Sequence, residues 1–354
     1  MTEGQTHEIG IEEATRLLQH ITANPPLMVI GSGCTAPHGL PTMSELASHL
    51  VTHVTSDSTQ WEAFQTSLSN GNDLESALQA HALSPEEVDL VVRETWRCVT
   101  ELDLAFHHKV LTGNQPFPLR DLLQHFGRTA SPHLQAVTTN YDRLVEYAAD
   151  LAGLETITGF TRGHIQRPVD RRSAAKAPAR VKCISIHKVH GSLDWFRDEH
   201  DREVGVPLPQ KIPEGLHPLI VTPGISKYQE THRLPYRHYL QSADEAIRDA
   251  NNILLLGYGF NDDHLEPDLR DQVSKRSTAI TVATHTLSEN GRQLLLDTIR
   301  PRQYLILEAQ GQRDTRLYSP KHPNGAVLVG HKLWSLDTIV DALQGTLESA
   351  NDTF

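Results

Sequence analysis

The side chains best suited to chemistry are an asparagine, an aspartate and a histidine, each just after an apolar run. Asn140 and Asp142 follow residues 134–139, and His190 follows residues 182–189. A histidine can accept a proton near neutral pH, so His190 is a candidate general base. Asparagine and aspartate are also preferred N-caps, so one of the two could serve only to start a helix. Two polar groups exceed what one cap needs, which favours a functional site.

A metal site is the alternative for this histidine, because His187 lies three residues before it. Positions three apart in a strand face opposite sides, so the two histidines are poor joint ligands. The three cysteines, Cys34, Cys98 and Cys183, are widely spaced and form no CxxC pair. We therefore expect no metal and no disulfide framework.

Two glycine pairs could lie close to a phosphate. Gly31-Ser32-Gly33, with Thr35 nearby, follows the apolar run 27–30. Gly257-Tyr258-Gly259 follows the run 253–256. Glycine lets the backbone approach a pyrophosphate, and free N–H groups in such turns bind anions. The signal is weak alone, because Ala36 replaces the third glycine of the usual dinucleotide pattern.

These four segments need a frame that brings them together. Each follows a short apolar run, which is the pattern of strands buried on both faces. In a doubly wound sheet, ligands bind at the carboxyl ends of such strands. The sequence therefore predicts an α/β fold, with a Rossmann-like, mostly parallel sheet, helices on both faces, and one cleft.

Other segments fill in this frame. We expect helices at 11–21, 42–54, 141–149, 242–250 and 334–347, and further strands at 154–157, 279–283 and 304–307. The stretch 55–126 has helix caps and no convincing strand, so residues 53–126 are predicted as a helical insertion into a domain made of 1–52 and 127–354. Residues 161–180 are predicted as a solvated basic loop, and 195–240 as a proline-rich, loop-rich crossing.

Charge and composition restrict the partners. The net charge of −12 disfavours direct binding to nucleic acid or to an anionic membrane surface. No apolar run approaches the ~20 residues of a membrane span, and the first residues lack a signal-peptide pattern. The sequence therefore predicts a cytoplasmic protein.

The four segments, in this order, resemble the Sir2 family, and specifically its zinc-free bacterial SIR2-like NADase domains. Gly31-Ser32-Gly33 and Gly39-Leu40-Pro41 resemble the family's Gly-Ala-Gly turn and Gly-Ile-Pro. Thr138-Thr139-Asn140-Tyr141-Asp142 resembles Thr-Gln-Asn-Ile-Asp, His190-Gly191 the His-Gly element, and Gly257-Tyr258-Gly259 the Gly-Thr-Ser element. The resemblance covers about residues 27–285.

The resemblance implies NAD as substrate and a role for each residue. Gly31, Ser32, Gly33 and Thr35 would face the diphosphate side. Asn140 would hold the nicotinamide ribose and order a water, Asp142 would contact the carboxamide, and His190 would act as base on the ribose. Gly257, Tyr258 and Gly259 would line the far phosphate and the adenosine.

Departures from the family pattern indicate the subtype. The four-cysteine zinc ribbon of the deacetylases is absent, and Thr42-Met43-Ser44 stands where they have Asp-Phe-Arg. Without that aromatic, water becomes the better acceptor, so the resemblance implies an NAD glycohydrolase. Bacterial relatives with this pattern deplete NAD in antiphage defence, as part of abortive infection. We expect a homo-oligomer, or a complex with a HerA-like ATPase or a short Argonaute.

Other functions stay open at this point. The chain could be a non-catalytic NAD or ADP-ribose sensor that regulates a partner ATPase. It could also be a protein deacylase or an ADP-ribosyltransferase. A dehydrogenase is disfavoured, because its acidic residue about 20 positions after the glycines has no candidate at a strand end: Asp57 lies in a predicted loop.

Overall fold

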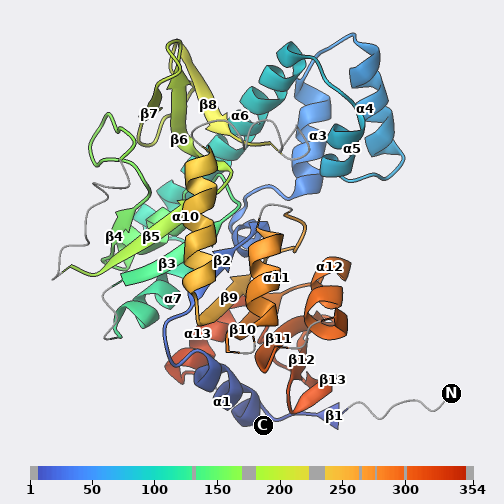
Figure 1. The fold of residues 1–354 in the computed structure, drawn as a ribbon, viewed down its shortest axis with the longest axis vertical. Coiled ribbons are helices and arrows are strands. Elements are labelled where there is room, and N and C mark those ends of the chain that lie inside the picture. Colours follow the sequence, from blue (N-terminus) through green and yellow to red (C-terminus); the bar gives the residue numbers. More distant parts are fainter. Residues whose placement is uncertain are drawn as a thin grey trace.

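The computed structural model describes residues 7–129, 133–169, 181–222, 236–262, 265–275, 277–298 and 301–347. Within these residues, ten strands form one sheet in the order β1-β13-β12-β11-β10-β9-β2-β3-β5-β4 (Figure 1). All neighbours from β11 to β4 pair in parallel, whereas β12 pairs antiparallel with β11 and β13. The bounds are β1 His7–Glu8, β2 Leu27–Ile30, β3 His133–Thr138, β4 Glu155–Ile157, β5 Cys183–Lys188, β9 Asn252–Leu256, β10 Ala279–Thr284, β11 Gln303–Gln310, β12 Asp314–Ser319 and β13 His322–Leu328. The predicted α/β fold with a mostly parallel sheet is confirmed.

Strand β2 marks the point where the strand order reverses. The next strand along the chain, β3, pairs on one side of it, and β9 pairs on the other. Crevices at such reversal points, beyond the carboxyl ends of the strands, are where open α/β sheets bind ligands. All three strands end next to predicted site residues.

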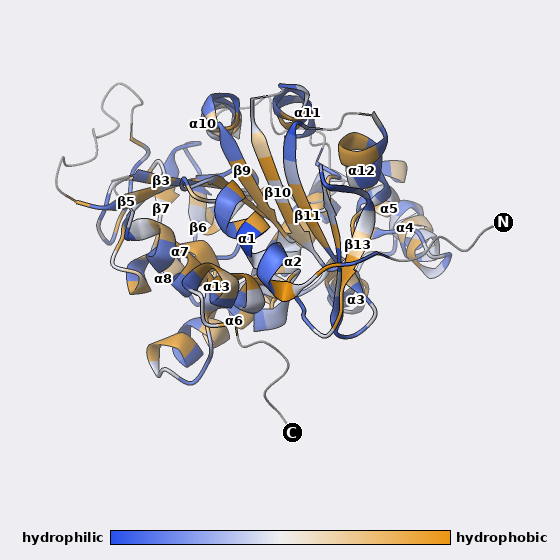
Figure 2. Cartoon of the chain, turned by 90° about the horizontal axis from the view of Figure 1, so that it is seen from below, coloured by the Kyte–Doolittle hydropathy of each residue, from blue (hydrophilic) through white to orange (hydrophobic). Residues whose placement is uncertain are grey.

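Helices cover both faces of the sheet, as Figure 2 shows from below. Residues of β2 alternate between the two cores: Met28 and Ile30 pack into one, and Leu27 and Val29 into the other. This explains why the strand is a continuous apolar run. The first core is covered by α1 Ile11–Ile21, α7 Pro118–Gly127, α8 Leu144–Leu151 and α13 Leu336–Gln344, and the second by α10 Tyr236–Asp249, α11 Glu266–Ser274, α12 Glu289–Arg292 and the helical turn η2 Gln293–Thr298.

The helical insertion has a small core of its own. It contains α3 Met43–His53, α4 Thr59–Ser69, α5 Leu74–Ala80 and the first turns of α6 Pro85–Leu111, at the upper right of Figure 1. Capping boxes start two of these helices: Thr42 with Glu45, and Ser84 with Glu87. The buried core residues run from Leu46 to Val91, while the later part of α6 packs on the main domain. The boundaries 53 and 126 stay a prediction.

The prediction that 195–240 is a loop-rich crossing is wrong. Strands β6 Gly191–Asp198, β7 Glu203–Gly205 and β8 Leu216–Ile220 form a second, antiparallel sheet in the order β7-β6-β8. Its strand character is hidden by Pro218 in β8, which an edge strand tolerates, and by a bulge between Gly191 and Phe196 that breaks the alternation. Residues 223–235 lie outside the described part.

Most remaining boundaries agree with the sequence within a few residues, with three exceptions. The helix predicted from residue 242 begins at Tyr236. The helix after β3 begins at Leu144 instead of residue 141, because residues 139–143 form the loop that carries Asn140 and Asp142. The edge strands β12 and β13 and the short β1 had no sequence prediction. Of the basic loop, 161–169 lacks regular structure, and 170–180 lies outside the described residues. No helix in the described part of the chain is long and apolar enough to cross a membrane.

Candidate active site

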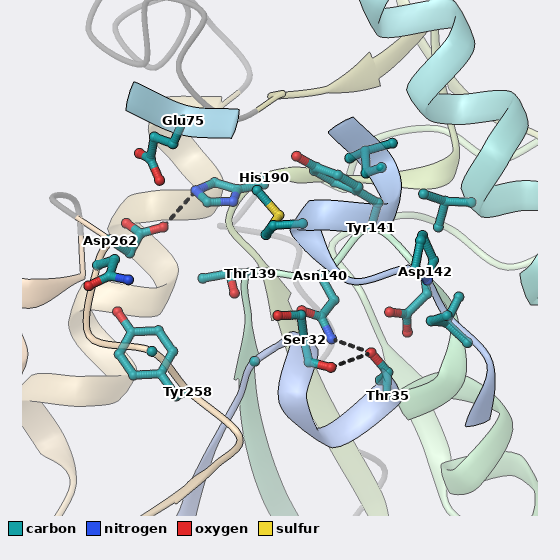
Figure 3. A pocket seen from close by; sticks show the side chains of 18 residues that line it. Ser32, Thr35, Glu75, Thr139, Asn140, Tyr141, Asp142, His190, Tyr258 and Asp262 are labelled. Carbon is teal, nitrogen blue, oxygen red and sulfur yellow. Dashed lines mark hydrogen bonds and ion pairs between the residues drawn. The ribbon is translucent and has the colours of Figure 1, made fainter. Parts of the chain in front are cut away.

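A pocket of about 210 Å³ opens at the strand-order reversal (Figure 3). Its floor comes from the segments that follow β2, β3, β5 and β9, and one wall comes from the helical insertion. The lining residues are Gly31, Ser32, Thr35, Leu40, Pro41, Met43, Leu46, Glu75, Val99, Thr139, Asn140, Tyr141, Asp142, His190, Tyr258, Gly259, Asn261 and Asp262. Four segments that are far apart in the sequence therefore meet in one cavity.

Asn140 is held by the turn after β2. Its Nδ2 donates to Oγ1 of Thr35 at 3.2 Å, and the same hydroxyl donates to the carbonyl of Ser32 at 3.3 Å. Its backbone N–H donates to Oγ1 of Thr138 at 3.1 Å, and this hydroxyl donates to the carbonyl of Ile30. The amide is 8% exposed, so its orientation is fixed while one edge faces the pocket.

Asp142 both starts α8 and lines the pocket. Its Oδ1 accepts from the backbone N–H of Leu144 at 3.1 Å. The buried Lys188 donates to the main-chain carbonyl of Asp142, and its Nζ also lies 2.9 Å from Oε1 of Glu146. Burial raises the pKa of Asp142 to about 6, and Lys188 opposes part of that rise. The carboxylate is therefore mostly ionised at neutral pH.

His190 lies in the tight turn between β5 and β6. The following Gly191 has φ +83°, and an added Cβ would lie 1.9 Å from the carbonyl oxygen of Leu219. The histidine Nε2 lies 2.9 Å from Oδ2 of Asp262, which follows β9. Tyr141 lines the same pocket, and its hydroxyl donates to the carbonyl of Val221 at 2.6 Å. Figure 3 shows the imidazole of His190 next to the carboxylate of Asp262, on the opposite side of the pocket from Thr35.

The glycines hold the pocket floor together through backbone contact. An added Cβ at Gly31 would lie 2.5 Å from the carbonyl oxygen of Gly257, and one at Gly257 would lie 2.3 Å from the N atom of Cys34. The N–H groups of Gly31 and Gly33 donate to the carbonyls of Leu256 and Gly257. Gly33 and Gly257 do not line the pocket, whereas Gly31 and Gly259 do. Gly33 and Gly257 therefore let the loops after β2 and β9 touch. The N–H groups of Gly31 and Gly33 are already hydrogen-bonded within the protein.

Negative charge dominates the pocket. Glu75, from α5 of the insertion, lines it together with Asp142 and Asp262, and Figure 3 shows its carboxylate on the side of His190. Among the described residues, no lysine or arginine lines the pocket. Such a cavity suits a ligand group that is cationic or becomes cationic during reaction.

The structure thus gathers Gly31, Ser32, Thr35, Asn140, Asp142, His190, Tyr258 and Gly259 around one cavity. Sequence reasoning missed Glu75, and it did not assign Asp262, which follows the Gly257-Tyr258-Gly259 turn, to the site. Glu75 follows the N-cap Asp73 in an ordinary short helix and gave no signal. Cys34, beneath the floor, has its pKa raised to about 12 by burial, so it is no nucleophile. Within the described residues, no group of three His, Cys, Asp or Glu side chains could hold a metal.

Comparison with known proteins adds a family likeness. Residues 135–305 match the family model of the SIR2-like domain. This SIR2-like segment contains Asn140, Asp142, His190 and the Gly257–Asp262 loop, whereas the turn after β2 lies before it. No curated protein matches the sequence.

Among solved structures, the chain is similar to a Sir2 homolog–NAD complex, with 16% identity, a TM-score of 0.48 and 97% coverage of each chain. It is also similar to a Sir2 enzyme structure concerned with mechanism and regulation, with 14% identity and a TM-score of 0.47. That second match covers 95% of this chain and all of the other. Because both TM-scores are below 0.5, the assignment of the fold depends on the strand order described above and not on these similarities.

Proposed function

We propose that this chain is an NAD glycohydrolase that releases nicotinamide and ADP-ribose. The observation that carries the proposal is the convergence of Asn140, Asp142 and His190 with the turn after β2 in one pocket. The pocket lies at the strand-order reversal, where dinucleotides bind in related architectures. The SIR2-like segment and the Sir2-like motifs of the sequence support NAD as the ligand.

The chemistry fits the charges of the site. Nicotinamide in NAD is a positively charged leaving group, and breaking its bond to the ribose builds oxocarbenium-like charge on the sugar. Asp142, which is mostly ionised at neutral pH, would stabilise that charge, and Glu75 adds a second carboxyl group to the pocket. Asn140 would hold the ribose and the incoming water, and His190 would take the proton that the water releases. No metal ion is needed for these steps.

The decisive experiment measures nicotinamide release from NAD by chromatography. We expect Asn140→Ala and His190→Ala each to reduce turnover by about 100-fold or more. The matched controls are Asn114→Ala and His200→Ala, which change the same residue types at exposed positions. Absence of release by the wild type, alone and with its genomic neighbour, would reject hydrolysis. Full activity of both site variants would reject the site.

The same experiment separates the alternatives. A non-catalytic sensor would be stabilised against heat by NAD without consuming it. A deacylase or an ADP-ribosyltransferase would consume labelled NAD only with an acyl-peptide or a protein acceptor. Met43 lines the pocket where the deacetylase pattern has an aromatic residue, and this favours water as acceptor.

In the cell, we propose that the chain is an effector of antiphage defence that depletes NAD when triggered. An unregulated NADase would deplete the NAD of its own cell, so activity must depend on assembly. The candidate assemblies are a homo-oligomer and complexes with a HerA-like ATPase or a short Argonaute. Co-expression with the neighbouring gene product, followed by size measurement and NAD assay, tests this. Equal activity of the isolated and assembled chain would contradict regulation by assembly.

A further inference from the structure

We propose that Asp262 is a positioning residue for His190: it holds the imidazole in place and stabilises its protonated form. The proposal rests on the proposed NAD hydrolysis and assigns a role to a residue that sequence reasoning left outside the site. The observation is the 2.9 Å distance between Nε2 of His190 and Oδ2 of Asp262, with both side chains about nine-tenths buried.

The two carboxylate oxygens of Asp262 have different contacts. Oδ1 accepts from the backbone N–H of Leu265, the residue just before α11, at 3.3 Å. Oδ2 is turned to the histidine. The hydrogen bond to Leu265 uses only one oxygen, so it does not account for the second contact. It instead fixes the carboxylate so that Oδ2 meets the ring.

The other groups around the histidine do not replace this carboxylate. Tyr141 donates its hydroxyl to the carbonyl of Val221, and burial raises the pKa of that hydroxyl, so it stays neutral. Lys188 contacts Glu146 and the main chain of Asp142. Glu75 faces the pocket from α5, on the same side as the histidine. Among the described residues that line the pocket, it is the other carboxylate on this side.

The pair has a defined task in the reaction. Water adds to C1′ of the ribose, and the bond between C1′ and the nicotinamide nitrogen breaks, with its electron pair going to the ring. The proton that the water loses passes to His190 and then to solvent. Imidazolium forms during this transfer, and a carboxylate at 2.9 Å stabilises it. Nε2 has no hydrogen-bond partner among the described residues, so this contact is a charge interaction and not an aligned hydrogen bond.

The test removes the charge and keeps the hydrogen bond to Leu265. In Asp262→Asn the amide oxygen can still accept from the backbone N–H of Leu265, as Oδ1 does in the wild type. Without the negative charge, the imidazolium that forms during proton transfer loses the carboxylate that stabilises it. The kinetic profile, kcat and KM for NAD measured together, should change in kcat alone. We expect kcat to fall about tenfold or more, with KM within about twofold of the wild type.

The matched control is Glu266→Gln, four residues on. Glu266 pairs with Arg270 on the same helix and does not line the pocket, so its profile should match the wild type. Glu75→Gln decides between the two carboxylates. If that variant shifts the profile and Asp262→Asn does not, the assignment to Asp262 is overturned.

A second measurement does not depend on turnover. Nitrogen NMR follows the ring of His190, whose signals are identified by their loss in His190→Gln. A changed Nε2 signal in Asp262→Asn supports the contact even if no nicotinamide is released, in which case the proposed hydrolysis alone fails. An unchanged Nε2 signal overturns the contact even in an active enzyme.

Discussion

Asp142 is a buried carboxylate whose position serves the pocket at a cost to stability. Its pKa is raised from the ordinary value of 3.8 to about 6, mainly by burial. The folded state therefore holds the proton more tightly than the unfolded chain does. The free energy of unfolding falls as the pH rises from about 4 to about 6, and the whole penalty is present at neutral pH.

We expect Asp142→Asn to be more stable than the wild type at pH 7–8 and inactive toward NAD. A difference of about two pKa units, in which the attraction of Lys188 is already included, corresponds to roughly 3 kcal/mol at most, so we expect a gain of about 1–3 kcal/mol. The asparagine still accepts from the N–H of Leu144, which preserves the start of α8. Urea unfolding at several pH values measures this. A variant that is less stable at pH 7.5 would contradict it.

The two glycines around Tyr258 should respond differently to the same substitution. Gly257 has φ +55° and its Cβ would lie 2.3 Å from the backbone of Cys34, whereas the nearest atom to a Cβ at Gly259 is 3.5 Å away. We expect Gly257→Ala to lose more than about 2 kcal/mol of stability, since even the left-handed backbone alone costs 1–2 kcal/mol. Gly259→Ala is the control and should fold normally. Similar unfolding midpoints for both would contradict this account.

At the residue scale, the site was predictable where it lies at strand ends. Asn140, Asp142 and His190 follow apolar runs, and parallel strands bring their carboxyl ends to one edge. Glu75 was not predictable, because its place depends on how the insertion packs over the sheet. The proton affinity of Asp142 depends likewise on burial and on Lys188, which are tertiary properties.

Helices α6 and α8 are joined by a buried ion pair close to the site. Both oxygens of Asp103 in α6 are used: Oδ1 accepts from the backbone N–H of Arg143 at 2.7 Å, and Oδ2 from its guanidinium. The hydroxyl of Tyr147 donates to the same Oδ2 at 2.5 Å. Because Arg143 directly follows Asp142, this network anchors the site loop to the helix that continues from the insertion.

We expect Asp103→Ala to lower the free energy of unfolding by about 3–5 kcal/mol, because it leaves the guanidinium of Arg143 buried and unpaired. Turnover should fall with it, since the Asn140–Asp142 loop loses its anchor. Asp89→Ala is the control on the same helix: its partner Arg93 is exposed, so the expected change is about 1 kcal/mol or less. Equal losses in both variants would contradict the anchoring role.

At the element scale, local signals were enough for helices and central strands. The capping boxes at Thr42 and Ser84 and the apolar run at Leu27–Ile30 are read directly from neighbouring residues. The small sheet β6–β8 escaped prediction, because its pairing joins residues far apart and its edge strand tolerates Pro218. Strands β12 and β13 escaped for a similar reason: their pairing with β11 and each other supplies order that their polar sequences do not signal.

For the whole molecule, the pocket has walls from two bodies, the sheet and the insertion. Ligand binding should therefore slow amide hydrogen exchange on both sides. With ADP-ribose, which is not consumed, we expect protection at 139–143 and at the same time in α3 and α5. Asn140→Ala, which weakens binding, is the control and should lose both effects together. Protection confined to the sheet side would contradict a closed, two-sided site.

The contact among Gly31, Gly33 and Gly257 limits how this molecule can change during evolution. At these positions any side chain would overlap another main chain, so the base of the cavity offers no room for variation. Size and polarity can vary instead in the helices opposite, where Met43, Leu46 and Glu75 each present an ordinary side chain. A related protein that binds a different molecule would therefore differ first in these helices, while the backbone contact among the three glycines would be unchanged.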